Sequence, residues 1–105
     1  MTDLVQVVTV VDSDDVANAL VRDAVAARLA ACGQVDGPLT STYWWEGQVE
    51  TATEWRATLK TTAERAAALE AFLVGQHPYD VPEVLTTPVT GGNPDYLRWV
   101  AGEVR

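Results

Sequence analysis

The segment from His77 to Glu83 (HPYDVPE) holds the densest group of side chains able to do chemistry. It places an imidazole, a phenol and two carboxylates close together in the sequence. Pro78 and Pro82 bias the residues before them toward extended backbone, so we expect a stiff segment. Imidazole and carboxylate groups bind zinc and copper, which makes His77 a candidate metal ligand. The alternative is a rigid connector whose polar groups satisfy the local backbone.

Other chemistry is sparse along the chain. His77 is the only histidine and Cys32 the only cysteine, which leaves no histidine pair and no CxxC zinc site. No P-loop, GxGxxG, HExxH or GxSxG motif occurs. Glu50 and Glu54 share one strand face, but four residues of strand separate them by about 13 Å, and a solvated strand face is the simpler interpretation. We therefore predict that the chain is not an enzyme.

Three consecutive aromatic residues occur at Tyr43, Trp44 and Trp45, and they include two of the four tryptophans of the chain. Neighbouring residues of a strand point to opposite faces. Trp44 and Trp45 therefore cannot both face the core of one protomer. One of them must be exposed, lie under a helix or meet another chain. Aromatic side chains are enriched at subunit interfaces, so we predict that these three residues contact another copy of the chain.

Length and charge limit the possible functions. The chain has 105 residues, which suits one domain covering residues 1–105. Seven basic and fifteen acidic residues give a net charge of −8. This balance argues against nucleic acid as a partner, because phosphate binding needs clustered Lys and Arg, and against an anionic membrane surface. The N-terminus (Met1-Thr2-Asp3) has no basic segment typical of a signal peptide, so we expect a cytoplasmic protein.

Hydrophobic periodicity and turn residues predict an α+β fold with the order β-α-β-β-α-β-α. The first six elements correspond to a ferredoxin-like βαββαβ arrangement, followed by an additional C-terminal helix. The hairpin is longer than usual, so part of it should project beyond the domain. The predicted elements are a strand at Leu4–Val11 buried on both faces, a helix from Asp14 to Gly33, hairpin strands at Leu39–Glu46 and Gln48–Lys60, a helix from Thr61 to Gly75, a strand at Glu83–Val89, and a helix starting at Asn93.

Two local details accompany this assignment. Thr61 and Glu64 fit a capping box at the start of the second helix. Cys32 falls in the last turn of the first helix, where small alanines precede it. The negative end of a helix dipole raises the pKa of a thiol, so we expect a buried and slowly reacting cysteine.

Several motifs in this order resemble the CutA family of divalent-cation tolerance proteins. They cover nearly the whole chain, and their combination at these spacings is specific although each one is short. The matching stretches are ARLAAC at 27–32, STYWWEG at 41–47, LKTT at 59–62, His77-Pro78-Tyr79 with Pro82-Glu83, PVT at 88–90, and Asp95-Tyr96-Leu97 with Trp99.

The resemblance implies a ferredoxin-like protomer, similar to PII signalling proteins, in a compact cytoplasmic homotrimer whose long hairpins pair across subunits. It implies a link to tolerance of copper and other divalent ions without established catalysis. Copper binding in some members is associated with a first-strand cysteine and two adjacent histidines. Here Thr9 and Gln76 occupy the cysteine and first-histidine positions. Only His77 matches, so we expect weak binding of a divalent cation, copper or zinc.

The sequence leaves three hypotheses about function. The leading one is a CutA-like homotrimer that responds to metal ions, with PII-like signalling and a small ligand or metal ion bound in the subunit clefts. The second is a stable trimeric scaffold without a direct metal role. The third is an enzyme with a site between subunits. Candidate cleft residues are Lys60, Tyr79 and Glu83, and the enzyme hypothesis adds His77.

Overall fold

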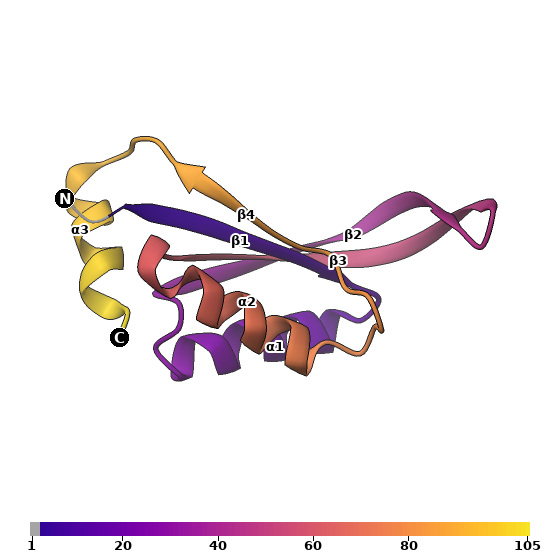
Figure 1. Cartoon of the computed structure of the whole chain (residues 1–105), viewed down its shortest axis with the longest axis horizontal. Helices are drawn as coiled ribbons and strands as arrows, with labels where there is room; N and C mark the ends of the chain where they lie inside the picture. Colours follow the sequence, from indigo (N-terminus) through magenta and orange to yellow (C-terminus); the bar gives the residue numbers. More distant parts are fainter. Residues whose placement is uncertain (1–2) are drawn as a thin grey trace.

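A four-stranded antiparallel sheet forms the centre of the computed structural model, which describes residues 3–105 (Figure 1). Met1 and Thr2, part of the N-terminus used for the localisation prediction, lie outside the described residues. The strands follow the order β2-β3-β1-β4 across the sheet, with all neighbours antiparallel. Their bounds are β1 Leu4–Val11, β2 Cys32–Trp45, β3 Gln48–Thr62 and β4 Val84–Val89. With three α-helices, this arrangement confirms the predicted α+β fold class.

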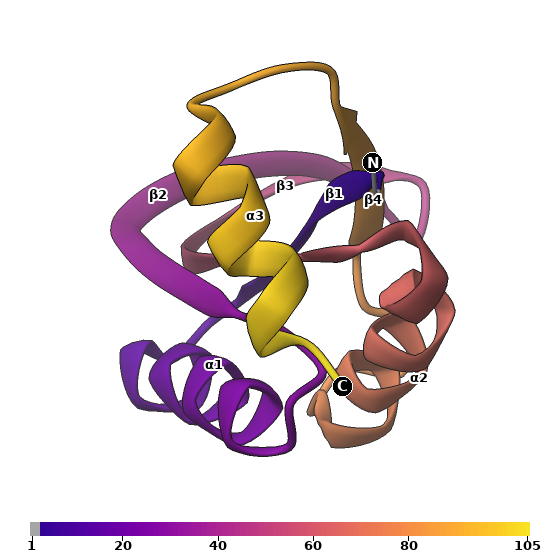
Figure 2. The same ribbon diagram turned by 90° about the vertical axis from the view of Figure 1, so that its left-hand side faces the viewer.

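Helices α1 (Asp14–Ala26) and α2 (Ala66–Gln76) cover one face of the sheet (Figures 1 and 2). Residues of β1 alternate, so Val5 and Val7 are buried and contribute to the core. The core also includes Leu20 of α1, Leu59 of β3, and Leu69 and Leu73 of α2. The opposite face of β1 is only half-buried in this chain, whereas the sequence predicted a strand buried on both faces.

The hairpin of β2 and β3 projects beyond the other two strands (Figure 1), as the sequence predicted. Val11, the last residue of β1, pairs with Trp55, so residues 48–54 of β3 have only β2 as a neighbour. Glu46 and Gly47 form the tight connection, both with positive φ, which suits the twist of a two-residue hairpin loop. The pairing of β2 with β3 shifts register between Asp36 and Leu39, on either side of Pro38.

The predicted end of the first helix at Gly33 is wrong, because α1 ends at Ala26. Arg28 takes a left-handed conformation with φ 62. Its N–H donates to the Val25 carbonyl, and the Leu29 N–H donates to the Ala24 carbonyl. These two bonds form a Schellman motif, which satisfies the last carbonyls of the helix. The chain then enters β2, and pairing with β3 prevails over the helix propensity of the alanines.

This early end places Cys32 at the start of β2 instead of in a helix, so the dipole argument for its thiol does not apply. Cys32 is half-buried, and its Sγ lies 3.2 Å from the hydroxyl oxygen of Tyr96. The capping box is also wrong. Thr61 belongs to β3, where its buried hydroxyl donates to the Leu29 carbonyl at 2.7 Å, and a short 3-10 helix at Ala63–Arg65 leads into α2.

The C-terminal helix α3 (Pro94–Glu103) lies at the end of the sheet away from the hairpin tip (Figure 1). It begins as predicted, since the Asn93 side chain accepts from the Asp95 N–H and Pro94 occupies the first turn. Val100 and Val104 pack with Leu4 and Ala31 in a second small core. No helix within residues 3–105 has the length and apolar character needed to cross a membrane.

Candidate functional site

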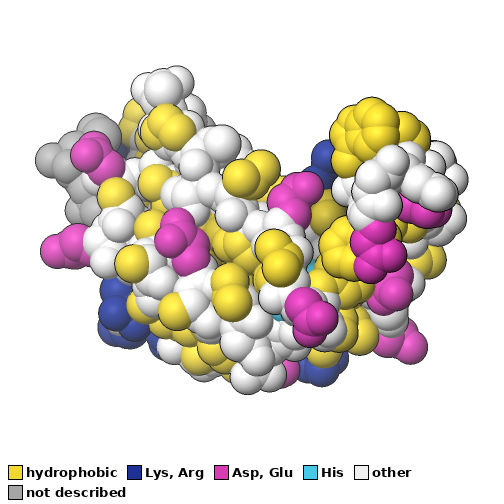
Figure 3. All heavy atoms as spheres, turned by 45° about the vertical axis from the view of Figure 1, so that its right-hand side comes forward, with side chains coloured by type: hydrophobic (Ala, Val, Ile, Leu, Met, Phe, Trp, Pro, Cys, Tyr) yellow, Lys and Arg dark blue, Asp and Glu magenta, His cyan; other side chains and the backbone are white. Residues whose placement is uncertain are grey.

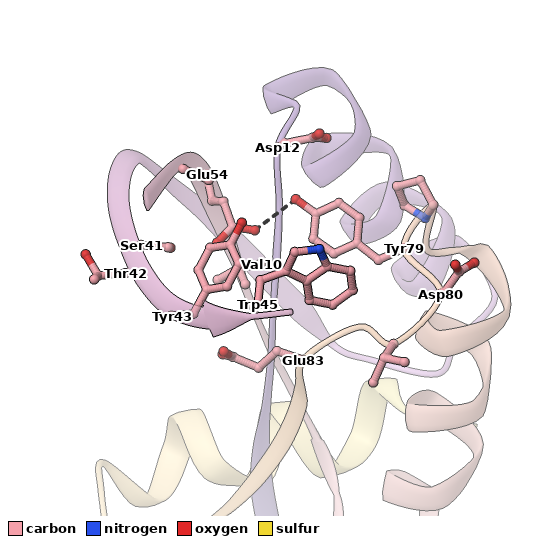
Figure 4. A pocket seen from close by; sticks show the side chains of 13 residues that line it. Val10, Asp12, Ser41, Thr42, Tyr43, Trp45, Glu54, Tyr79, Asp80 and Glu83 are labelled. Carbon is pink, nitrogen blue, oxygen red and sulfur yellow. Dashed lines mark hydrogen bonds between the residues drawn. The ribbon is translucent and has the colours of Figure 1, made fainter. Parts of the chain in front are cut away.

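A pocket of about 800 Å³ lies where the projecting hairpin, the end of β1 and the 77–83 segment meet (Figure 4). The space exists because β1 stops at Val11 while β2 and β3 continue. The segment after α2 lines the opposite side on its way to β4. The side chains that line the pocket include the carboxylates of Asp12, Glu54, Asp80 and Glu83 and the aromatic rings of Tyr43, Trp45 and Tyr79.

Tyr79 and Glu54 form the central polar contact of this pocket. The Tyr79 hydroxyl donates a 2.8 Å hydrogen bond to Oε2 of Glu54 (Figure 4). Burial, and then the hydrogen bond to Glu54 and the charge of that carboxylate, raise the pKa of Tyr79 well above its usual value of 10.0. The phenol therefore remains a hydrogen-bond donor throughout the physiological pH range.

Glu54 is a site residue that the sequence analysis missed, because it was assigned to a solvated strand face. Its side chain is only 6% exposed. In the strand register Glu54 lies one residue past the Val11–Trp55 pair, where β3 loses β1 as its neighbour. Tyr79 reaches this position from a segment 25 residues away. The sequence held one signal for this site. The apolar run of the first strand ends at Val11, whereas the predicted hairpin strands are much longer, so part of the hairpin had to continue beyond the first strand.

His77 supports the same segment from within the fold. It is 8% exposed, and its Nε2 lies 2.8 Å from the carbonyl oxygen of Val10. A carbonyl only accepts, so Nε2 carries the proton. The backbone N–H of Tyr79 donates to Nδ1 at 3.1 Å, and the two rings contact edge to face at 4.6 Å. Both ring nitrogens of a neutral imidazole are thereby used.

No three His, Cys, Asp or Glu side chains within residues 3–105 gather closely enough to hold a metal ion. The carboxylates of the pocket therefore line a broad surface instead of converging on one point. A metal bound through His77 would first have to displace the Tyr79 amide or the Val10 carbonyl. Copper or zinc binding at His77 remains a prediction.

Comparison with known proteins decides the family. Residues 5–103 match the family described as CutA1 divalent ion tolerance protein. The chain is a member of the CutA family. A divalent-cation tolerance protein CutA from Pectobacterium atrosepticum is 36% identical over 105 residues, which cover 100% of this chain and 96% of that protein. A CutA homolog from Xenopus laevis is 41% identical over 88 residues, or 84% of this chain, and the match spans 58% of that longer protein.

The fold agrees with this membership. The crystal structure of CutA from Xylella fastidiosa superposes with a TM-score of 0.95 at 33% identity, covering 99% of this chain and 100% of that one. Family membership confirms the resemblance inferred from the motifs and supports a role in divalent metal ion tolerance. The family is not known for catalysis.

The CutA fold brings together some of the predicted site residues and separates others. Tyr79 and Glu83 line the pocket, as do Tyr43 and Trp45. Lys60 does not line it. It lies on β3 beside Gln34, whose side-chain oxygen accepts from its ammonium group. Trp44 points away from the pocket lining, because it alternates with Tyr43 and Trp45 along β2, and it is 75% exposed.

Proposed function

We propose that this CutA-family chain supports divalent-metal tolerance as a cytoplasmic homotrimer. In this proposal it responds to a small ligand or metal ion in its subunit clefts, in the manner of PII-like signalling proteins, and it catalyses no reaction. The observation that carries the proposal is the apolar surface of the projecting hairpin, shown on the right in Figure 3. Trp44, Trp45 and Val49 are 75%, 56% and 58% exposed in the single chain.

Large exposed aromatic side chains at the end of a long hairpin favour burial by a partner. A hairpin with free edges invites pairing with another chain, and closed assembly removes those edges. The sheet face opposite the helices adds to this surface. Val8 on that face is half-buried, and Leu85, its partner on β4, is 58% exposed. A second copy of the chain offers a complementary surface of the same kind.

Light scattering on the purified protein tests the assembly. We expect a mass about three times the 11.3 kDa of one chain. A monomer at micromolar concentration would contradict the trimer and, with it, the subunit clefts.

A thermal-shift panel of metal ions and small molecules separates the responsive trimer from the scaffold. A ligand present at one hundred times its Kd stabilises the native state by about 2.7 kcal/mol. We expect at least one member of the panel to raise Tm. A trimer that shows no shift with any of them favours the scaffold hypothesis.

A further inference from the structure

The pocket beside the hairpin has a one-sided charge. Four carboxylates line it, from Asp12, Glu54, Asp80 and Glu83, while no Lys or Arg side chain among residues 3–105 does. The basic side chain of Arg56 pairs with Asp36 through bonds of 3.1 and 2.7 Å and is not part of the lining, although its charge also interacts with that of Glu83. Figure 3 shows acidic side chains around the hollow beside the hairpin. Such a surface attracts cations and repels anions.

Glu54 adds a second and independent observation. Glu54 is only 6% exposed, and it forms part of the pocket wall. Its Oε2 accepts from Tyr79, but Oε1 accepts no hydrogen bond from residues 3–105. Oε1 is not one of the buried side-chain atoms without a partner among residues 3–105, so it is accessible from the pocket. A ligand in the pocket with a positively charged N–H group would donate to it.

The aromatic side of the pocket indicates what kind of cation fits. Rings of Tyr43, Trp45 and Tyr79 line the same space as the carboxylates (Figure 4). The face of an aromatic ring attracts ammonium groups, and Trp is the strongest of the three side chains in this respect. Aromatic rings next to carboxylates form the usual environment for an alkylammonium group.

A bare metal ion fits the pocket poorly. Its ligands must lie about 2 Å from the metal, hence within about 4 Å of one another. The acidic side chains of residues 3–105 do not gather in threes at such distances. A pocket of about 800 Å³ is also far larger than one ion needs. An organic cation with an aliphatic body and separated amino groups can contact carboxylates and rings that lie apart.

We infer that this pocket binds a small organic ammonium compound, with Glu54 accepting from its ammonium group and Trp45 packing against the cation. The inference deepens the proposed function, on whose ligand-responsive part it rests, because it names the class of ligand. Tyr79 holds Glu54 in position, and its own hydroxyl proton is not transferred.

Isothermal titration calorimetry with diaminobutane tests the inference. Butanediol, which has the same chain length and no charge, serves as the control ligand at equal ionic strength. We expect diaminobutane to bind and butanediol to give no measurable heat. Glu54→Gln should weaken the binding of diaminobutane at least about tenfold. Glu50→Gln is the matched control, because Glu50 is exposed on the same strand and does not line the pocket.

A second variant keeps the test valid if Glu54→Gln fails to fold. Trp45→Leu removes the aromatic ring from a side chain that is 56% exposed in the single chain, so the protomer should fold. Because Trp45 is also a predicted interface residue, light scattering must first show that this variant has the same mass as the wild type. We expect it also to weaken diaminobutane binding, whereas Trp45→Phe should retain most of it.

Each outcome bears on a separate claim. Absence of diaminobutane binding, or equal binding of the diol, overturns the inference, as does Zn²⁺ binding that depends on Glu54 and excludes the diamine. Light scattering on the same samples distinguishes the two proposals. If the protein is a trimer that does not bind diaminobutane, the proposed assembly stands and the ligand inference is overturned. In that case a neighbouring copy fills the pocket or the pocket is unused. A monomer overturns the trimer whatever the calorimetry shows.

Discussion

Tyr79 and Glu54 lie 25 positions apart in the sequence, and their side chains meet at 2.8 Å where β1 ends and the hairpin continues. This single bond connects the segment after α2 to the base of the hairpin. It also orients a buried carboxylate on the wall of the pocket beside the hairpin. The shape of the candidate site therefore depends on a contact between two segments that fold as different elements.

Tyr79→Phe removes the only hydrogen bond that the described residues give to the Glu54 carboxylate. We expect the free energy of unfolding to fall by roughly 1–3 kcal/mol, because a buried carboxylate loses its donor. Tyr43→Phe is the control, since the Tyr43 hydroxyl makes no hydrogen bond within residues 3–105 and is exposed. Thermal unfolding at one fixed protomer concentration measures both. Equal Tm values for the two variants would show that the bond contributes nothing to stability.

Replacement by Val should have opposite effects on stability at Thr9 and at Thr61. Both hydroxyls are buried, but Thr61 donates to the Leu29 carbonyl, whereas the Thr9 hydroxyl has no partner within residues 3–105. Thr9→Val replaces an unsatisfied hydroxyl with a methyl group of similar size, so we expect stabilisation by about 1 kcal/mol. Thr61→Val should destabilise by about 1–2 kcal/mol. Denaturant unfolding of both variants checks the signs, and a destabilised Thr9→Val would reveal a partner for that hydroxyl.

Trp44→Glu tests the hairpin as an assembly surface. In the isolated chain this side chain is largely exposed, so its replacement should cost the protomer less than about 0.5 kcal/mol. If Trp44 is buried between subunits, the introduced charge should shift the measured mass from three chains toward one. Val74→Glu is the control, because Val74 is also exposed but belongs to α2 and not to the hairpin. An unchanged mass for Trp44→Glu would remove Trp44 from the interface.

The contact between Tyr96 and Cys32 predicts a pH effect at the alkaline end. The hydrogen bond with Cys32, followed by burial, raises the pKa of Tyr96 to about 12 from 10.0. Because the folded-state pKa is the higher one, folding favours the neutral phenol. This contribution to stability is complete below pH 10 and is lost as the pH rises from 10 to 12. Ultraviolet titration should show Tyr96 ionising earlier in Cys32→Ala, and an unchanged curve would exclude the contact as the cause.

His77 is expected to act mainly as a structural residue. His77→Ala should lower Tm, because it leaves the Val10 carbonyl and the Tyr79 amide without their partner. Gln76→Ala at the exposed neighbouring position is the control. Calorimetry with copper(II) or zinc should show only weak binding to the wild type. Tight binding that disappears in His77→Ala, with Tm unchanged, would instead identify His77 as a metal ligand.

Much of the fold follows from local patterns in the sequence. The run of β-branched residues at Leu4–Val11 predicts β1, and the Thr- and Trp-rich stretches around Gly47 predict a hairpin of unusual length. Asn93 and Pro94 predict the start of α3. These signals depend on residues a few positions apart, so they do not require knowledge of the tertiary structure. The family resemblance likewise depends on short motifs and their spacing.

Other features depended on contacts between distant segments, and only the tertiary structure decided them. The alanine-rich stretch before Cys32 has helical periodicity, but pairing of β2 with β3 ends α1 at Ala26. Glu54 alternates like a solvated strand residue, yet it is buried because β1 stops one position short of it and Tyr79 occupies the space. His77 had the chemistry of a metal ligand, but Val10, 67 positions away, occupies its Nε2. Burial and hydrogen-bond partners arise from which segments meet in space, and periodicity within one segment carries no information about that.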